Sequence, residues 1–341
     1  MRRPRSHTGP LLVFKMVISQ CPTAALHDIL RTTGLSLDLG GARVELRSDS
    51  LALAQQLRSV YPHFPCVAPE GLSDVHVEMS PPGFVRRFLR PQICFTSDGE
   101  QQFHPFPHDT ALPLFEWGVN WLIGQRLNHL LLFHAGCLER DGLGLLLPAT
   151  PGSGKSTLTA ALAHSGWRLL SDEFGVCEPN SGQLMAMLKP IALKNESIDV
   201  IRRFAANATI GPTFPKTRKG DVAHVAASVL DVASRRDTAM PALVVLPKWS
   251  AGAATTLEPL REDEVFSALA FNAFNYEVLG ATSFDAVLAI ARNCPGWRLT
   301  YSDLTHAVGE LESLWPAAVT RSRDQLPQDM RLDSAQLDRP K

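Results

Sequence analysis

Residues 149–157, ATPGSGKST, have the composition and spacing of a loop that binds phosphate. They match the pattern G-x-x-x-x-G-K-[ST], with Ala149 in the place of the first glycine. Gly152 and Gly154 would let the backbone turn so that successive N–H groups point at phosphate oxygens. An apolar run precedes the loop and a helical pattern follows it, which is the strand–loop–helix context that the motif requires. The sequence therefore predicts a nucleotide-binding site.

A cation and a hydroxyl at the end of the loop suit a triphosphate and its metal ion. Lys155 would neutralise oxygens of the β- and γ-phosphates, and the Ser156 hydroxyl would be a ligand of Mg²⁺. We expect ATP and Mg²⁺ as the ligands. The residues predicted to bind the nucleotide are Ala149, Thr150, Pro151, Gly152, Ser153, Gly154, Lys155, Ser156 and Thr157.

Two carboxylates and a histidine lie near this loop in the sequence. Asp172 and Glu173, in SDEFG, follow the helix after the loop by one strand, which would place them at a strand end near the phosphates. Such a carboxylate can take a proton from an attacking hydroxyl or hold Mg²⁺ through water, and the alternative is a pair of solvated turn residues. His134 could hydrogen-bond the γ-phosphate or orient the carboxylate, and the alternative is a histidine packed in the core.

Strands and helices that would position these residues alternate from residue 111 onward, as in an α/β domain. Apolar runs at 131–139 and 143–148, joined by a turn signal, predict a hairpin that leads into the loop. A helix is expected at 152–164, and PALVVLP reads as a central strand. Trp117 and Trp121 share one face of a further predicted helix, where packing explains them better than contact with a ligand.

Residues 25–110 predict a small α+β domain without chemistry of its own. The segment 35–48 alternates around two glycines, which indicates a hairpin, and Asp49 or Ser50 can cap a following helix. Further strands are expected at 74–79 and in a second hairpin that turns at 97–99. We assign 111–318 to the nucleotide-binding domain, 1–24 to a poorly ordered N-terminus and 319–341 to a disordered tail.

Composition argues against several classes of partner, although a local basic patch is compatible with it. The net charge of −1 over 341 residues gives no basic excess for nucleic acid, and no apolar run is long enough to span a membrane. Six scattered cysteines form neither a C-x-x-C pair nor a zinc pattern, so we expect reduced thiols and a cytoplasmic protein.

The motifs together resemble a kinase family. FHAG with His134, then PGSGKST, then LLSDE resemble the C-terminal catalytic domain of HPr kinase/phosphorylase. Across residues 25–315 the chain is similar to the HprK-related kinase A proteins associated with exosortase/PEP-CTERM gene systems, through LFEWGVNWLIG, LLLPATPGSGKSTL, LLSDEFG, LKPIALKNESI and TRKGDVAH. The resemblance implies a P-loop kinase core of the HPr kinase type, similar to PEP carboxykinase, and a homo-oligomer.

The resemblance also implies roles for single residues. The first acid of the family's pair accepts a proton from a substrate serine, and that position is Asp172 here, with Glu173 replacing the second aspartate. Where the family has a glutamate of the metal site, this chain has Lys189 and Lys194, and Glu196 is the nearest carboxylate. Ser156, Glu173 and Glu196 are therefore the metal candidates. The family's arginine segment for the reverse reaction is not recognisable, so phosphorylase activity is not predicted.

A basic segment, FPKTRKGDVAHV at 214–225, carries Lys216, Arg218 and Lys219 before a glycine. It could close over phosphate or grip the phosphate acceptor, and the alternative is a solvated surface loop.

We predict an ATP-dependent kinase that transfers the γ-phosphate to a hydroxyl. Lys155, Asp172 and His134 are the predicted catalytic residues. The acceptor is a protein serine by the resemblance, or else a small hydroxylated molecule. The other interpretations are a P-loop ATPase, which turns over ATP without an acceptor, and a regulatory protein that binds ATP without catalysis.

Overall fold

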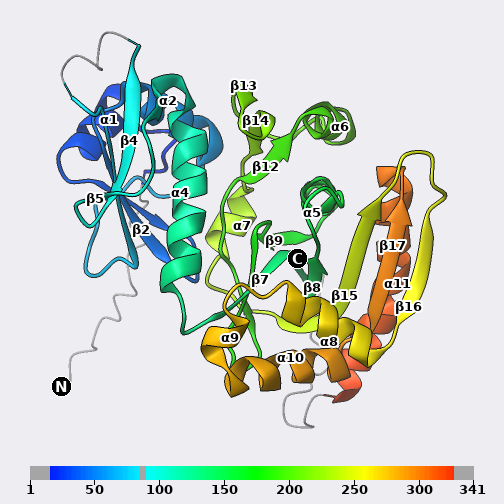
Figure 1. The fold of residues 1–341 in the computed structure, drawn as a ribbon. Helices are drawn as coiled ribbons and strands as arrows, with labels where there is room; N and C mark the ends of the chain where they lie inside the picture. Colours follow the sequence, from blue (N-terminus) through cyan, green and yellow to red (C-terminus); the bar gives the residue numbers. More distant parts are fainter. Residues whose placement is uncertain (1–15, 84–89, 326–341) are drawn as a thin grey trace, which may run out of the picture.

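The structure is a computed structural model that describes residues 16–83 and 90–325 (Figure 1). Its first part is a six-stranded sheet with the order β1-β2-β3-β4-β5, in which β6 also pairs with β4. The strands are β1 (Leu35–Asp38), β2 (Arg43–Ser48), β3 (Val75–Ser80), β4 (Gln92–Ser97), β5 (Glu100–Gln101) and β6 (Phe106–Pro107). Both predicted hairpins are confirmed, since β1 pairs with β2 and β4 with β5 in antiparallel fashion.

Helices α1 (Thr23–Arg31) and α2 (Leu51–Val60) belong to this first part, and the 3₁₀ turn η1 (His108–Thr110) leads into α4 (Ala111–Arg126). Ser50 caps α2, because its side chain accepts a hydrogen bond from the Leu53 amide. Gly118 on α4 meets the ring of Phe95 on β4 so closely that a Cβ there would lie 2.3 Å from the ring. Helix α4 therefore packs against the first sheet while it leads into the second part (Figure 1).

The chain ends differ in part from the expected disorder. Residues 1–15 and 326–341 lie outside the described residues. Within residues 16–24, however, Ile18 and Cys21 are fully buried and α1 has begun, so this stretch is ordered by its apolar contacts. Helix α11 (Leu304–Gln325) continues past residue 318, and Trp315 and Ala318 on it are buried.

The second part is built on an eight-stranded sheet with the order β11-β10-β7-β8-β15-β17-β16, in which β9 also pairs with β7. Its strands are β7 (Leu131–Arg140), β8 (Leu143–Pro148), β9 (Arg168–Ser171), β10 (Phe174–Cys177), β11 (Leu184–Met185), β15 (Met240–Trp249), β16 (Thr256–Leu260) and β17 (Gly296–Tyr301). Strand β15 lies between β8 and β17 and is parallel to both, which confirms that PALVVLP is central. The mixed α/β fold is thus confirmed.

The remaining elements surround this sheet. A small sheet, β12-β14-β13, is formed by β12 (Ile191–Lys194), β13 (Phe214–Thr217) and β14 (Gly220–Val225). The helices are α5 (Lys155–Ala163), α6 (Glu196–Phe204), α7 (Val229–Ala233), α8 (Glu262–Phe271), α9 (Tyr276–Leu279) and α10 (Ala281–Asn293). The basic segment is a β13–β14 hairpin and not a loop, because main-chain pairing continues to Thr217 and Gly220 at its tip.

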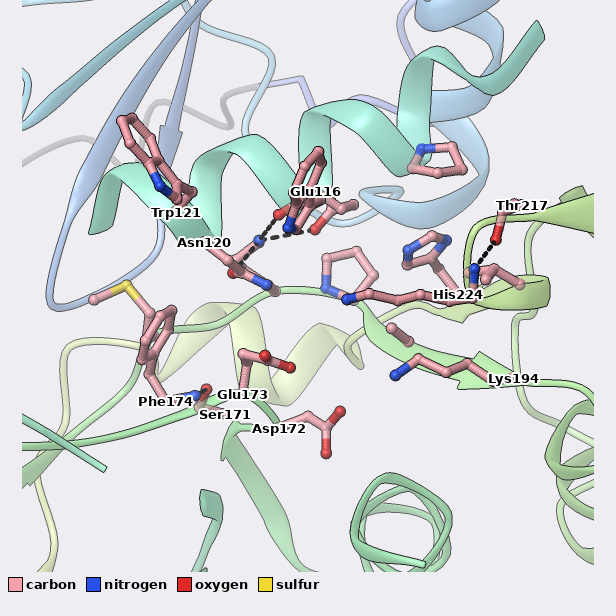
Figure 2. Close-up of a pocket in the computed structure, with 18 of the residues that line it drawn as sticks. Glu116, Asn120, Trp121, Ser171, Asp172, Glu173, Phe174, Lys194, Thr217 and His224 are labelled. Atoms are coloured by element: carbon pink, nitrogen blue, oxygen red, sulfur yellow. Dashed lines mark hydrogen bonds and ion pairs between the residues drawn. The ribbon is translucent and has the colours of Figure 1, made fainter. Parts of the chain in front are cut away.

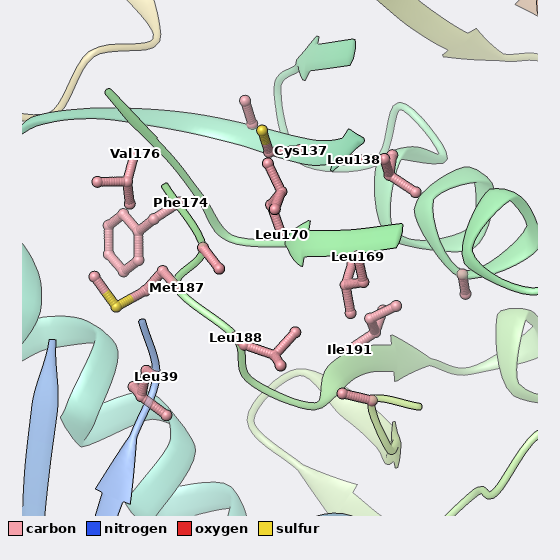
Figure 3. Close-up of a cluster of buried hydrophobic side chains, with 14 of the residues drawn as sticks. Leu39, Cys137, Leu138, Leu169, Leu170, Phe174, Val176, Met187, Leu188 and Ile191 are labelled. Carbon is pink, nitrogen blue, oxygen red and sulfur yellow. The ribbon is translucent and has the colours of Figure 1, made fainter. Parts of the chain in front are cut away.

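One apolar cluster fixes the strands around the predicted acid pair (Figure 3). Leu169 and Leu170 of β9 and Phe174 of β10 pack here, and Leu39 reaches the cluster from the first part of the chain (Figure 3). Burial of each such side chain contributes about 1.5–3 kcal/mol, so the turn between β9 and β10 has little freedom to shift. No helix in the described part of the chain has the length and apolar character needed to cross a membrane.

Candidate functional site

The predicted phosphate loop runs from the end of β8 to the start of α5. Helix α5 begins at Lys155, three residues later than expected, because Gly152 and Gly154 adopt left-handed φ values of 89° and 87°. The ends of two neighbouring strands hold the loop. The Tyr301 hydroxyl donates to the Gly154 carbonyl at 3.1 Å, and the Trp249 amide donates to the Ser153 carbonyl at 2.8 Å.

The N-terminus of α5 is open to an anion. The first N–H groups of a helix have no partner within the helix, and Gly154 at the N-cap has no side chain that could accept from them. These amides and the positive end of the helix dipole form the kind of site that binds phosphate in other proteins.

Lys155 and Asp172 meet beneath this loop. Lys155 Nζ donates a hydrogen bond to the main-chain carbonyl of Asp172 and lies 3.6 Å from its Oδ1. The two side chains are only 8% and 6% exposed. Asp172 Oδ1 accepts no hydrogen bond from any described residue, so a buried acceptor atom next to the lysine is left free.

Strand pairing explains how Asp172 reaches this place. One edge of β7 pairs with β9, through Cys137 and Ser171, and then with β10, through His134 and Phe174. The chain therefore makes a tight turn at residues 171–174, in which the Phe174 amide donates to the Ser171 hydroxyl at 3.1 Å. Asp172 stands at this turn, beside the strand that leads to the loop.

His134 links the acid pair to the start of the loop. Its carbonyl accepts from the Ala149 amide at 3.4 Å, and its Nε2 lies 4.0 Å from Glu173 Oε1. Burial, and after it the charge of Lys155, lowers the pKa of His134, so the ring is neutral near pH 7. Burial acts to raise the pKa of Glu173, but Lys155 and other cations outweigh it, so the pKa is lowered and the carboxylate is ionised.

A cavity of about 370 Å³ opens on the other side of the acid pair, between the β9–β10 turn, α4 and the small sheet (Figure 2). Asp172, Glu173 and Lys194 line one wall, and α4 forms the opposite one (Figure 2). The aromatic residues of the lining are Phe106, Trp117, Trp121, Phe174 and Phe274.

Lys189 is part of the wall and not a free cation. Its Nζ lies 3.1 Å from the Glu116 carboxylate and donates to the Glu116 carbonyl at 2.8 Å and to Asn120 Oδ1 at 2.6 Å. The Tyr61 hydroxyl donates to the same carboxylate at 2.7 Å. This buried network, the α4 clamp of Tyr61, Glu116, Asn120 and Lys189, fastens the first part of the chain to the second.

Three further cations line the cavity without such partners. Lys194 ends β12, and Arg218 and Lys219 form the turn of the β13–β14 hairpin. All three are exposed, and no described carboxylate forms an ion pair with them. The Arg218 guanidinium lies 5.3 Å from the centre of the Phe106 ring, so an aromatic contact holds it over the cavity.

The structure brings together Lys155, Asp172, Glu173 and His134, as the sequence predicted. Glu196 is different, since it is exposed at the start of α6 and does not line the cavity. Trp117 and Trp121 both contact Phe103, as expected for packing, but they also line the cavity, which the sequence analysis did not predict. Their helical spacing was compatible with contact with a ligand, but it did not separate that role from packing.

The oxygen donors at the site suit Mg²⁺. The Ser156 hydroxyl and the carboxylates of Asp172 and Glu173 are hard ligands, and Asp172 Oδ1 has a lone pair to offer. No cluster of three or more ligating side chains is found among the described residues. Proteins commonly hold Mg²⁺ with one or two carboxylates together with substrate phosphates and water.

Comparison with known proteins does not assign the chain to a family. No protein-family model matches it, and no curated protein matches it. The function is therefore inferred from the residues of the site.

Proposed function

We propose that this protein is an ATP-dependent phosphotransferase with a P-loop kinase fold, which transfers the γ-phosphate to a hydroxyl group. The observation that carries the proposal is the position of Asp172. Its carboxylate is buried beside Lys155 of the phosphate loop and also lines a cavity with room for an acceptor. A carboxylate that lies between a phosphate-binding lysine and a pocket for the acceptor is an arrangement suited to phosphoryl transfer.

The loop would bind the triphosphate. The amides at the start of α5, to which no cap side chain is bonded, would donate to phosphate oxygens, and Lys155 would exchange its contact with Asp172 for the β- and γ-phosphates. Bound Mg²⁺, held by Ser156 and the Glu173 carboxylate, would neutralise charge on the phosphates. Glu196 has no part in this proposal, since it does not line the cavity.

Asp172 would act as the general base. The acceptor oxygen attacks the γ-phosphorus in line with the bond to the β–γ bridging oxygen, that bond breaks and ADP leaves. The acceptor proton passes to the Asp172 carboxylate. A buried, fixed carboxylate suits this step, because it needs little reorganisation when the hydroxyl approaches.

His134 and Glu173 would assist the reaction next to Asp172. A neutral imidazole can donate one hydrogen bond to a γ-phosphate oxygen without competing with Lys155 for charge. Glu173 lies 4.0 Å from that ring and can orient it. We therefore assign His134 to phosphate contact and Glu173 to positioning and metal binding.

The cavity favours transfer over the two other interpretations. An ATPase needs room for one water beside the γ-phosphate, and a nucleotide sensor needs no second pocket. Here about 370 Å³ lies against the proposed base, which falls within the range of ligand pockets of about 300–1000 Å³.

Incubation of the full chain with γ-labelled ATP, Mg²⁺ and a whole-cell extract tests the proposal. We expect label to pass to an acceptor with the wild-type chain and not with Asp172→Asn. Release of labelled phosphate from the purified chain alone, at the rate seen with extract, would support an ATPase. Tight ATP binding with neither transfer nor hydrolysis would support a sensor.

A further inference from the structure

We infer that the acceptor is a small-molecule alcohol with an apolar body and an anionic group, bound in the cavity beside Asp172, and not a serine on a protein surface. The inference rests on the proposed phosphotransferase function and deepens it. It is carried by the depth of the base, the apolar wall and the unpaired cations of the rim.

The first argument is access. Asp172 is only 6% exposed and is reached from the cavity, whose far wall is α4 (Figure 2). A serine hydroxyl extends a single bond beyond Cβ, so a protein substrate would have to insert main chain between α4 and the β9–β10 turn. The α4 clamp holds these walls together through Lys189 and Glu116. A free small molecule enters the same space without that requirement.

The second argument is the apolar wall. Trp117 and Trp121 come from α4, Phe106 precedes that helix, and Phe174 and Phe274 complete the lining from the second part of the chain. The Trp121 side chain remains 39% exposed, although large apolar side chains are usually buried. Aromatic walls on both sides of a pocket bind an apolar body through burial of its surface.

The third argument is charge. Within the described lining, Glu116 and Lys189 neutralise each other, and Asp172 and Glu173 face the lysine of the loop. Lys194, Arg218 and Lys219 remain at the rim without ion-pair partners. Lys194 and Lys219 repel each other. Partial burial and this repulsion lower the pKa of Lys194, although the carboxylates of Glu173 and Asp172 act in the opposite direction. A carboxylate or phosphate group on the acceptor would relieve the repulsion.

Neutral polar groups complete the lining. His224 is buried, and burial lowers its pKa to about 4, so it is an uncharged ring at neutral pH. Its Nδ1 has no hydrogen-bond partner among the described residues. Asn120 and Thr217 add an amide and a hydroxyl. Such groups fix the orientation of a ligand, while the aromatic wall and the rim cations supply affinity.

Binding can be tested without ATP, with 3-phenyllactate as the probe because it joins an alcohol, a ring and a carboxylate. We expect saturable quenching of tryptophan fluorescence by 3-phenyllactate, lost in Trp117→Phe/Trp121→Phe. Removal of a charge-assisted contact in Arg218→Ala should weaken binding about tenfold or more. Lactate, which lacks the ring, should also bind more weakly. Lys216→Ala, on the same hairpin but outside the lining, is the matched control.

Transfer is tested with γ-labelled ATP and an extract separated by ultrafiltration into small molecules and proteins. We expect label on organic compounds of the small-molecule fraction. Trp121→Ala and Arg218→Ala should raise the KM for that fraction and leave the KM for ATP unchanged, whereas Phe284→Ala, an exposed aromatic outside the cavity, should alter neither.

Two results would overturn the inference. One is label confined to retained proteins and unaffected by Trp121→Ala, which would keep the kinase and identify a protein acceptor. The other is absence of saturable 3-phenyllactate quenching. Failure of the proposed kinase function can be distinguished from these results, because ATP would then be neither bound nor consumed. The quenching titration would still show whether the cavity binds an anionic alcohol.

Discussion

Lys155 Nζ lies 3.6 Å from Asp172 Oδ1, and both side chains are almost completely buried. The lysine comes from the first residue of a helix and the aspartate from a turn between two strands of the neighbouring sheet edge. Because the lysine also donates to the Asp172 main-chain carbonyl, part of its contact survives any change of the aspartate side chain. The effects of the two residues can therefore be separated by mutation.

Lys155→Ala should lower ATP affinity. The lysine would supply charge-assisted hydrogen bonds to the phosphates, and such bonds contribute about 1.5–3 kcal/mol each, so we expect a loss of about 10–100-fold. Titration with ATP by calorimetry measures the effect. Arg31→Ala, which removes an exposed cation on α1, is the control and should bind ATP like the wild type. Unchanged affinity in Lys155→Ala would show that the lysine does not contact phosphate.

Asp172→Asn should block transfer and leave ATP affinity nearly intact. The amide keeps the size of the side chain and the main-chain contact with Lys155 but cannot accept the acceptor proton. General bases contribute about 10²–10⁴-fold, and kcat should fall by that factor. If the variant lost ATP affinity but kept its kcat, Asp172 would instead be a ligand of the metal ion or a residue that stabilises the fold.

The loop at 149–157 and the strands beside it could be predicted because their signals are local. Gly152, Gly154 and Lys155 define the loop by spacing alone, and the two apolar runs before them define the β7–β8 hairpin. The position of Asp172 followed from one further rule, that a residue after a strand stands at the edge of the sheet. The start of α5 was wrong by three residues, since left-handed glycines delay the helix.

The cavity beside Asp172 could not be predicted, because its walls are joined by contacts between residues far apart in the sequence. Lys189 stands where the related family has a glutamate of the metal site, yet its partner here is Glu116 on α4, more than seventy residues earlier in the chain. The small sheet pairs Ile191 with Val225, and no local pattern indicates that pairing. Trp121 stands at a position that its helical spacing assigns to packing. It lines the cavity only because α4 lies opposite Asp172 in the folded chain.

The α4 clamp should dominate the stability of the interface between the two parts. Lys189→Met would leave the Glu116 carboxylate buried without a cation, and loss of one partner of a buried pair costs about 3–5 kcal/mol. Urea unfolding measures this cost. In Glu116→Gln/Lys189→Met no charge remains buried, so part of the stability should return. Arg261→Met breaks a fully exposed pair and should leave the unfolding midpoint nearly unchanged, and an equally small effect of Lys189→Met would refute the clamp.

The free energy of unfolding should decrease as the pH is lowered, because of His224. Burial lowers the pKa of this ring from 6.5 to about 4, so as the pH falls below 6.5 the unfolded chain binds a proton that the folded chain does not. At about 1.4 kcal/mol per pKa unit, the free energy of unfolding loses about 3 kcal/mol, and the loss stops once the folded ring is also protonated. Urea unfolding across this range should show a smaller pH dependence in His224→Gln than in the wild type.

The exposed His129 provides the comparison for this titration. His129→Gln also removes a histidine but leaves the buried ring in place, so this variant should reproduce the wild-type pH dependence that His224 causes. Parallel pH profiles for His224→Gln and the wild type would mean that the buried ring is not the source of the effect.

Alanine substitutions at two glycines of the loop can distinguish the cost of a strained backbone from the cost of a steric clash. Gly152 and Gly154 have nearly equal φ values, 89° and 87°, so alanine at either position carries a similar left-handed cost of about 1–2 kcal/mol. A Cβ on Gly154 would in addition lie 2.4 Å from the Tyr301 hydroxyl and 2.8 Å from Trp249 Cβ, whereas a Cβ on Gly152 meets nothing within 4 Å.

Gly154→Ala should therefore lower both Tm and ATP affinity more than Gly152→Ala, because the loop must move away from the ends of β15 and β17. Thermal unfolding with and without ATP measures the two effects together. Tyr301→Phe in the Gly154→Ala background removes the closest collision but keeps the contact with Trp249, so recovery should be partial. Equal losses in the two alanine variants would show that strand ends do not fix the loop, and that its shape depends on the glycine φ angles alone.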